Sequence, residues 1–335
     1  MHKKLAIVLI ITAVCLVVAL WGIELDKARE ALESTNWWFL VPMFLLYLVA
    51  HSIRSLRLGI LVGMPVPFKR IFAINIIGFL AINVIPLRLG EMVRPYLLSE
   101  REGVPFARGL AAILMERLLD MLMLLCMLIG LTWLVDLPVD GIQVKGVDVV
   151  AAGQRFAGLI VALGVSGVLA LLFVGEPVVK LLEKLPMGQR VAEFARKFRD
   201  GILALAKRPL RFLWLLMLSA TIWIVTFLAV GVVMAAFPGV PVGVAPTWAT
   251  WTITLSGMTA VPTPGFFGAY ELFCSAALWL FEVEPSVAKT FAVVLHLGQL
   301  GFTVGLGGFF LVLEGLSLRQ LVQPGQPGSS KTGDD

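Results

Sequence analysis

The chain has 335 residues, of which 59% are hydrophobic and only 15% are charged. Its mean hydropathy of +0.93 excludes a water-soluble globular protein, because apolar runs of this length need a lipid phase. The net charge is +5, with 27 Lys and Arg residues against 22 Asp and Glu residues. Since the basic residues lie between the apolar runs and form no single stripe, we expect them to set membrane topology, with no nucleic-acid partner.

Six apolar segments are long enough to cross a hydrocarbon core of about 30 Å as helices. They are residues 5–23, 37–53, 109–135, 156–174, 212–237 and 287–313. The first follows Lys3 and Lys4 with the layout of a signal peptide. It is longer than a usual signal-peptide core and no small-residue cleavage site follows it, so we interpret it as an uncleaved span. The three cysteines show no metal-type spacing, and we expect no disulfide, metal or other cofactor.

Three further apolar stretches are too short to cross the membrane as helices. They are residues 71–85, 246–261 and 269–281, and the first two end at a tip rich in Pro and Gly. Short apolar segments interrupted by these residues are typical of broken or re-entrant helices in transporters. The alternative is that the prolines and glycines are packing kinks with no substrate.

The positive-inside rule sets the expected orientation. Lys and Arg residues near the N-terminus, between the second span and the first tip, after that tip, and at 176–211 are expected in the cytoplasm; those after the second span include Arg54, Arg57, Lys69 and Arg70. We expect an amphipathic helix in the cytoplasmic loop 176–211. His51, near the end of a span, is expected at the membrane interface.

These segments predict an all-α polytopic membrane protein with six full spans and two broken helix hairpins. The hairpins are expected to open to opposite sides of the membrane, which gives an inverted repeat of about residues 37–135 and 212–313. Both repeats would lie in one transmembrane domain, residues 1–318, followed by a disordered cytoplasmic tail, residues 319–335. We expect a multi-pass protein of the cell inner membrane with both termini in the cytoplasm.

Several polar side chains fall where hydrocarbon should exclude them. Glu116, Arg117 and Asp120 lie 7 to 11 residues into a span, roughly 10–17 Å deep. At about 2.5–3.5 kcal/mol per charge, they must face protein or water. Either an Arg117–Asp120 pair holds helices together or the residues line a polar substrate track. His296, with Gln299 on the same face of the last span, is open to the same two interpretations.

The two expected tips differ in charge. The first contains Arg88, Glu91 and Arg94, and guanidinium groups beside backbone N–H groups freed at a helix break suit a phosphate. The second, residues 262–268, offers backbone groups and aromatic rings but no charge. This asymmetry favours an amphiphilic substrate with an anionic head group over a small hydrophilic solute.

Three motifs in order carry a family resemblance. Residues 83–94, 115–120 and 261–271 read NVIPLRLGEMVR, MERLLD and VPTPGFFGAYE. Together they resemble the lysylphosphatidylglycerol synthase transmembrane-region family, also called flippase-like membrane proteins, over nearly the whole chain. Because the chain ends in a tail rich in Gly, Pro and Ser, it resembles the stand-alone kind without a soluble synthase domain.

The resemblance implies movement of a lipid between leaflets and no enzymatic activity. The implied partners are membrane lipids, whether phospholipid, aminoacyl-phospholipid or a polyprenyl- or hopanoid-type lipid; the oligomeric state is not implied. The expected substrate-binding positions are Asn83, Pro86, Arg88, Gly90, Glu91, Arg94, Glu116, Arg117, Asp120, Pro262, Pro264, Gly265, Gly268 and Glu271, with His296 added from the depth argument.

Three other classes of protein remain as alternatives. An ion-coupled solute transporter shares the inverted-repeat plan, and a non-transporting membrane scaffold would need no substrate site. More remotely, residues 164–167 read GVSG, which matches the serine motif of rhomboid-like intramembrane proteases, with His296 as the base. That short pattern is also common in helices packed through small residues. No phosphate-binding GxxxxGK[ST] motif occurs, so direct use of ATP is not expected.

Overall fold

The computed structural model describes residues 2–85, 90–134, 209–261 and 263–317, together with 143–144, 147–148, 174–184, 321 and isolated positions between 162 and 199. The chain forms two compact units. The first comprises Met1–Glu116 and Thr221–Asp335, and the second comprises Arg117–Ala220. Two helices, α6 and α10, run through the boundaries between the units.

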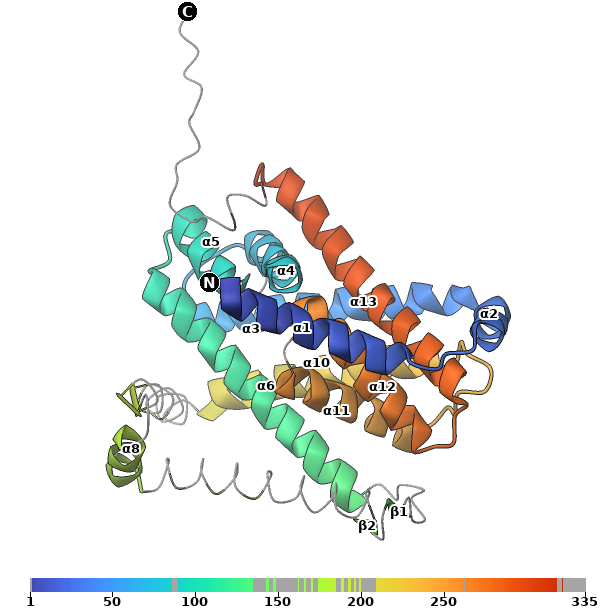
Figure 1. Ribbon diagram of the computed structural model, residues 1–335. Helices are drawn as coiled ribbons and strands as arrows, with labels where there is room; N and C mark the ends of the chain where they lie inside the picture. The colour runs from blue at the N-terminus through green and yellow to red at the C-terminus, as the bar shows by residue number, and fades with distance from the viewer. Residues whose placement is uncertain are drawn as a thin grey trace, which may run out of the picture. The chain divides into compact units, whose positions relative to one another are not determined.

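The described residues are helical apart from loops, turns and one pair of two-residue strands (Figure 1). The helices that lie wholly or partly in the first unit are α1 (His2–Leu20), α2 (Leu25–Ser34), η1 (Trp37–Phe39), α3 (Leu40–Val62), α4 (Phe68–Val84), α5 (Val93–Glu102), α6 (Phe106–Leu134), α10 (Pro209–Met234), α11 (Val244–Ala260), η3 (Pro264–Phe266), α12 (Ala269–Trp279) and α13 (Pro285–Leu313). The second unit adds α8 (Glu176–Glu183) and the antiparallel strands β1 (Gln143–Val144) and β2 (Val147–Asp148).

Three of the described helices are long and apolar enough to cross a membrane. They are Trp37–Val62, Pro209–Met234 and Pro285–Leu313. A fourth span results if Leu9–Leu20 and Leu25–Ser34, which meet at 81°, are counted as one bent span. The prediction of a helical, multi-pass membrane protein is therefore confirmed at this level. The count of six spans and the inverted repeat stay predictions, and the expected span 156–174 lies almost wholly outside the described residues.

The second expected span, residues 37–53, was predicted too short. The helix does not end near residue 53 but continues to Val62, where Gly63 adopts a left-handed conformation and ends it. The extension places Arg57 inside the helix rather than in a cytoplasmic loop, and both His51 and Arg57 are buried. The positive-inside rule treats arginine as a loop residue, but an arginine with a carboxylate partner can lie within a packed helix.

The three short apolar stretches form helices of the expected kind. Two 17-residue helices, α4 and α11, each lead into a break and then into a short return helix, α5 or α12. We call α4–α5 the first hairpin and α11–α12 the second hairpin. The helix lengths in α3–α6 are 23, 17, 10 and 29 residues, and those in α10–α13 are 26, 17, 11 and 29.

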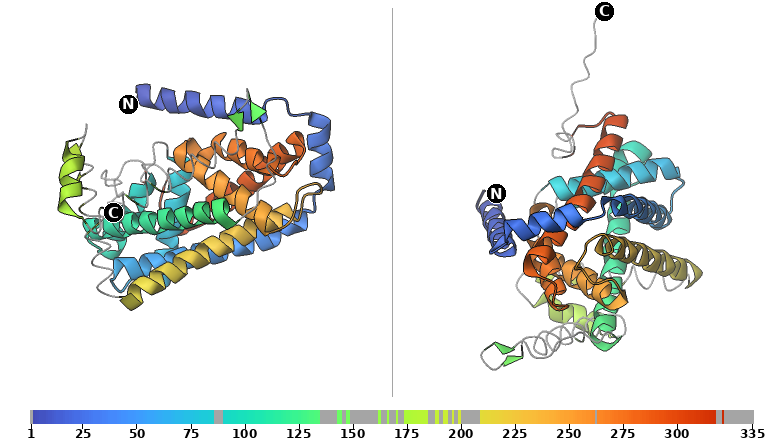
Figure 2. Two further views of the ribbon diagram at one scale, coloured as in Figure 1. Left: turned by 90° about the horizontal axis from the view of Figure 1, so that it is seen from below. Right: turned by 90° about the vertical axis from the view of Figure 1, so that its right-hand side faces the viewer.

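Helix α13 packs against both hairpins of the first unit. It contacts α4 and α12, and it also contacts α2 and α3 (Figure 1). Gly307 allows the approach to α4, because an ideal Cβ there would lie 2.6 Å from Cβ of Leu80. Figure 2 shows α1 running alongside α12, against which it packs. The apolar core of this unit gathers residues of α3, α4, α5, α6 and α13, including Leu58, Ile77, Leu98, Ile113 and Leu311.

The end of α4, in the first hairpin, meets the tip of the second hairpin. The last residues of α4 contact η3, which forms the tip of the second hairpin. An ideal Cβ on Gly265 would lie 3.5 Å from the carbonyl oxygen of Asn83. The fold therefore brings together two segments that are about 180 residues apart in the sequence.

Gly90 sets how tightly the first hairpin folds back on itself. An ideal Cβ on this residue would lie 2.3 Å from the backbone carbon and oxygen of Ala81. Because the obstacle is backbone, we expect Gly90→Ala to lower the free energy of unfolding by about 1–3 kcal/mol.

The matched control is Gly301→Ala in α13, where nothing lies within 4 Å of the added Cβ. Alanine in an open helical position is expected to be neutral or to stabilise by up to about 1 kcal/mol. Equilibrium unfolding in detergent micelles measures both variants. Equal stability of Gly90→Ala and wild type would contradict this close approach.

Candidate functional site

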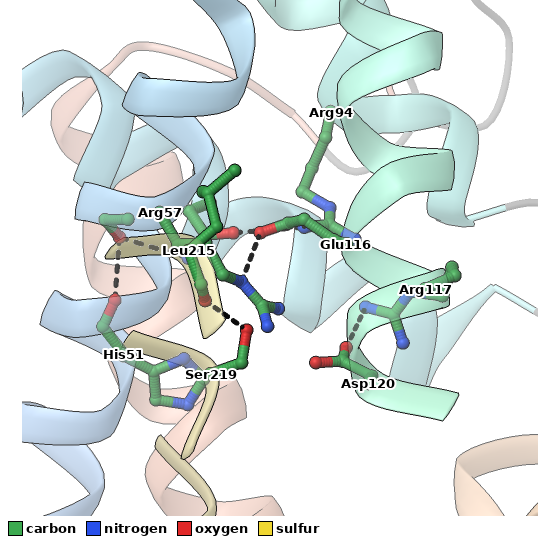
Figure 3. Close-up of polar contacts among 10 residues, drawn as sticks. His51, Arg57, Arg94, Glu116, Arg117, Asp120, Leu215 and Ser219 are labelled. Carbon is green, nitrogen blue, oxygen red and sulfur yellow. Dashed lines mark hydrogen bonds and ion pairs between the residues drawn. The ribbon is translucent and has the colours of Figure 1, made fainter. Parts of the chain in front are cut away.

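The first group of buried polar side chains comes from four helices of the first unit. We call Arg57, Asn75, Arg94 and Glu116 the arginine cluster. Nη1 of Arg94 lies 2.6 Å from Oε2 of Glu116, and Nε of Arg57 lies 3.6 Å from Oε1 of the same carboxylate (Figure 3). The exposed fractions of Arg57, Arg94 and Glu116 are 1%, 0% and 1%. Two buried guanidinium groups therefore share one carboxylate.

A chain of hydrogen bonds connects Arg94 of the arginine cluster to the backbone of α3. Nη1 of Arg94 donates to Oδ1 of Asn75 at 3.2 Å, and Nδ2 of Asn75 donates to Oγ of Ser55 at 3.0 Å. Oγ of Ser55 in turn donates to the carbonyl oxygen of His51 at 2.7 Å. Every side chain in this chain is buried. The network holds α3, α4, α5 and α6 in one arrangement.

The sequence of α4 makes room for Arg94. An ideal Cβ on Gly78 would lie 2.1 Å from Cγ of Arg94, so the arginine stem occupies the space of an absent side chain. The guanidinium carbon lies 5.1 Å from the ring centroid of Phe79, at a distance that favours a cation–π contact. Gly78 and Phe79 thus fix the buried side chain of Arg94, the second residue of α5.

The second group lies where the tip of the second hairpin meets α13. We call Glu271 and His296 the glutamate–histidine pair. Nδ1 of His296 lies 2.6 Å from Oε1 of Glu271, and Nε2 lies 3.0 Å from the carbonyl oxygen of Gly265. The other carboxylate oxygen of Glu271 accepts the N–H of Gly268 at 2.6 Å. Both side chains of the pair are buried.

Aromatic rings enclose the glutamate–histidine pair. The ring of Tyr270 stacks on that of His296, with ring centroids 4.4 Å apart. The ring centroid of Phe267 lies 5.1 Å from that of His296. Nε2 of Gln299 donates to the hydroxyl of Tyr270 at 2.8 Å, so Gln299 supports the histidine through the tyrosine. The prediction that His296 and Gln299 share a face is confirmed in this form.

Glycine is required at two positions of the second tip. Gly265 and Gly268 have φ values of 57° and 81°, in the left-handed region that favours glycine. An ideal Cβ on Gly268 would also lie 2.6 Å from Cβ of Cys15 in α1. The tip therefore combines a sharp turn with close packing against the N-terminal helix.

The two buried pairs have similar positions along their helices. Arg94 is the second residue of α5 and meets Glu116, the eleventh residue of α6. Glu271 is the third residue of α12 and meets His296, the twelfth residue of α13. The chemistry is exchanged, because the basic group comes from the return helix in the first case and from the long helix in the second.

The second unit contains the ion pair expected from spacing. Nη2 of Arg117 lies 3.7 Å from Oδ2 of Asp120, and both side chains are partly exposed. The local Arg117–Asp120 interaction is confirmed as a loose pair. Glu116, one residue earlier, instead faces Arg57 and Arg94.

The remaining expected site residues belong to neither group of buried polar side chains, or they lie outside the described residues. Asn83 donates to the carbonyl oxygen of Phe79 in its own helix, Glu91 is half-buried, and Pro264 begins η3. Pro86, Arg88 and Pro262 lie outside the described residues. Among the described residues, no group of three or more His, Cys, Asp or Glu side chains is close enough to hold a metal ion.

Sequence reasoning missed Arg57 and Asn75 as members of a site. The signal for Arg57 was the apolar run that follows it, residues 58–62, which indicates that the helix continues. Asn75 had a weaker signal, as a lone amide in an otherwise apolar half-length segment.

Comparisons with known proteins agree with the membrane architecture. The family model described as "Lysylphosphatidylglycerol synthase TM region" matches residues 5–307. The chain is 30% identical over 122 residues to a UPF0104 membrane protein of Methanocaldococcus jannaschii, and 27% identical over 97 residues to one of Methanothermobacter thermautotrophicus. These matches cover 35% and 29% of this chain, and 36% and 29% of those relatives' lengths. No solved structure was found to match. Because the family model covers most of its length, the chain belongs to the family of lysylphosphatidylglycerol synthase transmembrane regions.

Proposed function

We propose that this protein moves a lipid with an anionic or phosphate-bearing head group between the two leaflets of a membrane, without changing the lipid chemically. The observation that carries the proposal is the arginine cluster, in which Arg57 and Arg94 share the carboxylate of Glu116 inside a membrane protein. The family's description, which names a lysylated phospholipid, supports a lipid substrate.

The arginine cluster is chemically suited to a phosphate. Guanidinium groups bind phosphate oxygens through paired N–H donors, and they are hydrated more weakly than an ammonium group. A buried ionic group of this kind adds little to stability, since apolar residues of similar volume pack as well or better. Its presence in the core of a membrane protein is therefore better explained by a substrate than by folding.

The hairpins supply the second line of support. Half-length helices that break inside the protein are typical of transporters, where they place backbone groups beside the substrate. Here the end of α4 lies against η3, the tip of the second hairpin. The similar lengths of α3–α6 and α10–α13 fit the predicted inverted repeat, in which the two hairpins open to opposite sides of the membrane. We further propose a single transmembrane domain in the cell inner membrane, with both termini in the cytoplasm. Both ring nitrogens of His296 face Glu271 or Gly265, which disfavours a serine protease.

Reconstitution into vesicles tests this function. Purified protein is placed in liposomes that hold a trace of phosphatidylglycerol or phosphatidylcholine with a fluorophore on one acyl chain, and dithionite then quenches the probe in the outer leaflet. We expect a larger quenched fraction than in protein-free vesicles, with faster movement of the anionic phosphatidylglycerol. If neither probe moves, lipid movement is wrong and a scaffold or a solute transporter remains.

A further inference from the structure

We propose that the glutamate–histidine pair binds one transferable proton, and that this proton latches the tip of the second hairpin onto α13. The inference rests on the proposed function, because it makes the proton the ion that drives lipid movement. The proton-binding site consists of Glu271 and His296. When the proton is bound, His296 can also donate a hydrogen bond to the carbonyl oxygen of Gly265.

The hydrogen-bond donors and acceptors around His296 indicate that the pair holds one extra proton. The two ring nitrogens of His296 face a carboxylate oxygen at 2.6 Å and a backbone carbonyl oxygen at 3.0 Å. A neutral imidazole has only one N–H, so it can donate to only one of these acceptors. The observed arrangement needs one more proton, carried either on the second ring nitrogen or on Oε1 of Glu271. In both cases the pair as a whole holds it.

Loss of that proton would free the tip. A neutral ring that donates to ionised Glu271 would turn the lone pair of Nε2 toward the carbonyl oxygen of Gly265, and the two groups would repel each other. Gly265 lies in η3, and Glu271 also accepts the N–H of Gly268. Both ends of the tip are thus tied to the same pair. Left-handed backbone at Gly265 and Gly268 makes this turn one that few other residues could adopt.

The titratable side chains that interact with the pair in the described part of the chain include Tyr270 and Cys274, both of α12. Tyr270 of α12 stacks on the imidazole, and its hydroxyl accepts from Gln299. Cys274 of α12 and Tyr47 of α3 interact electrostatically with Tyr270. Lys289, on the same helix as His296, is turned away, because its ammonium donates to the carbonyl oxygen of Trp21 and lies 5.9 Å from the ring of Trp279. From η3 the pair is met by the carbonyl oxygen of Gly265, and Cys15 of α1 lies against Gly268.

The exchange of chemistry between the two buried pairs supports a division of roles. Arginine stays protonated at every pH that a cell meets, so Arg94 keeps its charge and suits a head group. Histidine and glutamate are the residues that exchange protons in membrane pumps and transporters. The similarly placed pair in the second set of helices therefore contains a group that can gain and lose a charge.

The proton is counted directly, without any transport. The chain has three histidines, so the ¹⁵N spectrum of the full-length protein in lipid nanodiscs can be assigned by removing each histidine in turn. Infrared difference spectra report the carboxylic acid of Glu271. As the pH is raised, we expect one proton to leave the pair in a single step, and Glu271→Gln to remove that step. A neutral ring beside an ionised carboxylate at every pH at which the protein stays folded would overturn the proposal.

The coupling is tested in the same vesicles that test lipid movement. With the membrane potential held at zero by K⁺ and valinomycin, a pH gradient should bias labelled phosphatidylglycerol toward one leaflet, by up to about tenfold per pH unit for one proton per lipid. His296→Gln and Glu271→Gln should abolish the bias. The controls His2→Gln and Glu33→Gln, at the N-terminus and at an exposed position of α2, should retain it.

The outcomes separate the two claims. Lipid that moves without any bias in the wild-type protein would overturn proton coupling and leave the proposed function intact. Vesicles in which the wild-type protein moves no lipid would overturn the proposed function, and with it the driving role of the proton. A gradient-dependent bias that survives in both variants would place the coupling site elsewhere.

Discussion

Glu116→Gln is expected to lower the free energy of unfolding by about 3–5 kcal/mol, the largest loss of stability that we predict for a single substitution. The substitution removes the carboxylate between Arg57 and Arg94 and leaves both guanidinium groups buried. Transfer of a charged group out of water costs several kcal/mol unless a partner offsets it. A neutral amide can accept a hydrogen bond but offsets none of this charge.

Equilibrium unfolding in mixed detergent micelles measures this loss. The matched control is Glu33→Gln, which breaks the exposed Arg29–Glu33 pair at a similar distance of 2.7 Å. Because water solvates both groups there, the control should change the free energy of unfolding by less than about 1 kcal/mol. If Glu116→Gln is as mild as Glu33→Gln, the arginine cluster is open to water and its description as a closed ionic group is wrong.

Arg94→Gln is expected to slow the movement of labelled phosphatidylglycerol by roughly 10- to 100-fold, given about 1.5–3 kcal/mol for a charge-assisted hydrogen bond to the head group. The effect is large because Arg94 supplies a guanidinium fork at the centre of the cluster. Arg94→Lys keeps the charge but loses the fork, so it should fall between wild type and Arg94→Gln.

The initial rate of probe quenching per reconstituted protein measures both Arg94 variants. Arg29→Gln serves as the control, since it removes an exposed arginine from α2 and should leave the rate unchanged. Size-exclusion chromatography in detergent verifies that each variant is folded. A folded Arg94→Gln protein that moves lipid at the wild-type rate would exclude Arg94 from the head-group site.

The broken hairpins could be predicted from the sequence because their signals are local. Apolar runs of half the needed length, each next to a segment rich in Pro and Gly, predicted α4, α11 and α12 to within a few residues. The Arg117–Asp120 interaction was predictable for the same reason, since three residues along a helix place two side chains on one face.

The partners of Glu116 could not be predicted, because they come from other helices. Arg94 is 22 residues away and Arg57 is in α3, and no periodic pattern along one helix encodes such contacts. The counting of basic residues also misplaced Arg57, since that rule describes loops and the residue lies inside an extended helix. Glu271 and His296 were each singled out, Glu271 by its motif and His296 by its depth, but their contact became evident only once α12 and α13 were packed together.

We propose that the arginine cluster is present to bind a lipid head group and adds little to the stability of the fold. The triple variant Arg57→Met/Arg94→Met/Glu116→Leu tests it most directly, because apolar replacement of a buried ionic group is often neutral or stabilising, whereas removal of one partner is not. Movement of labelled phosphatidylglycerol by this variant in liposomes is the measurement. The account predicts a folded protein whose lipid movement falls to that of protein-free vesicles. A folded triple variant that moves the lipid as fast as wild type would contradict it.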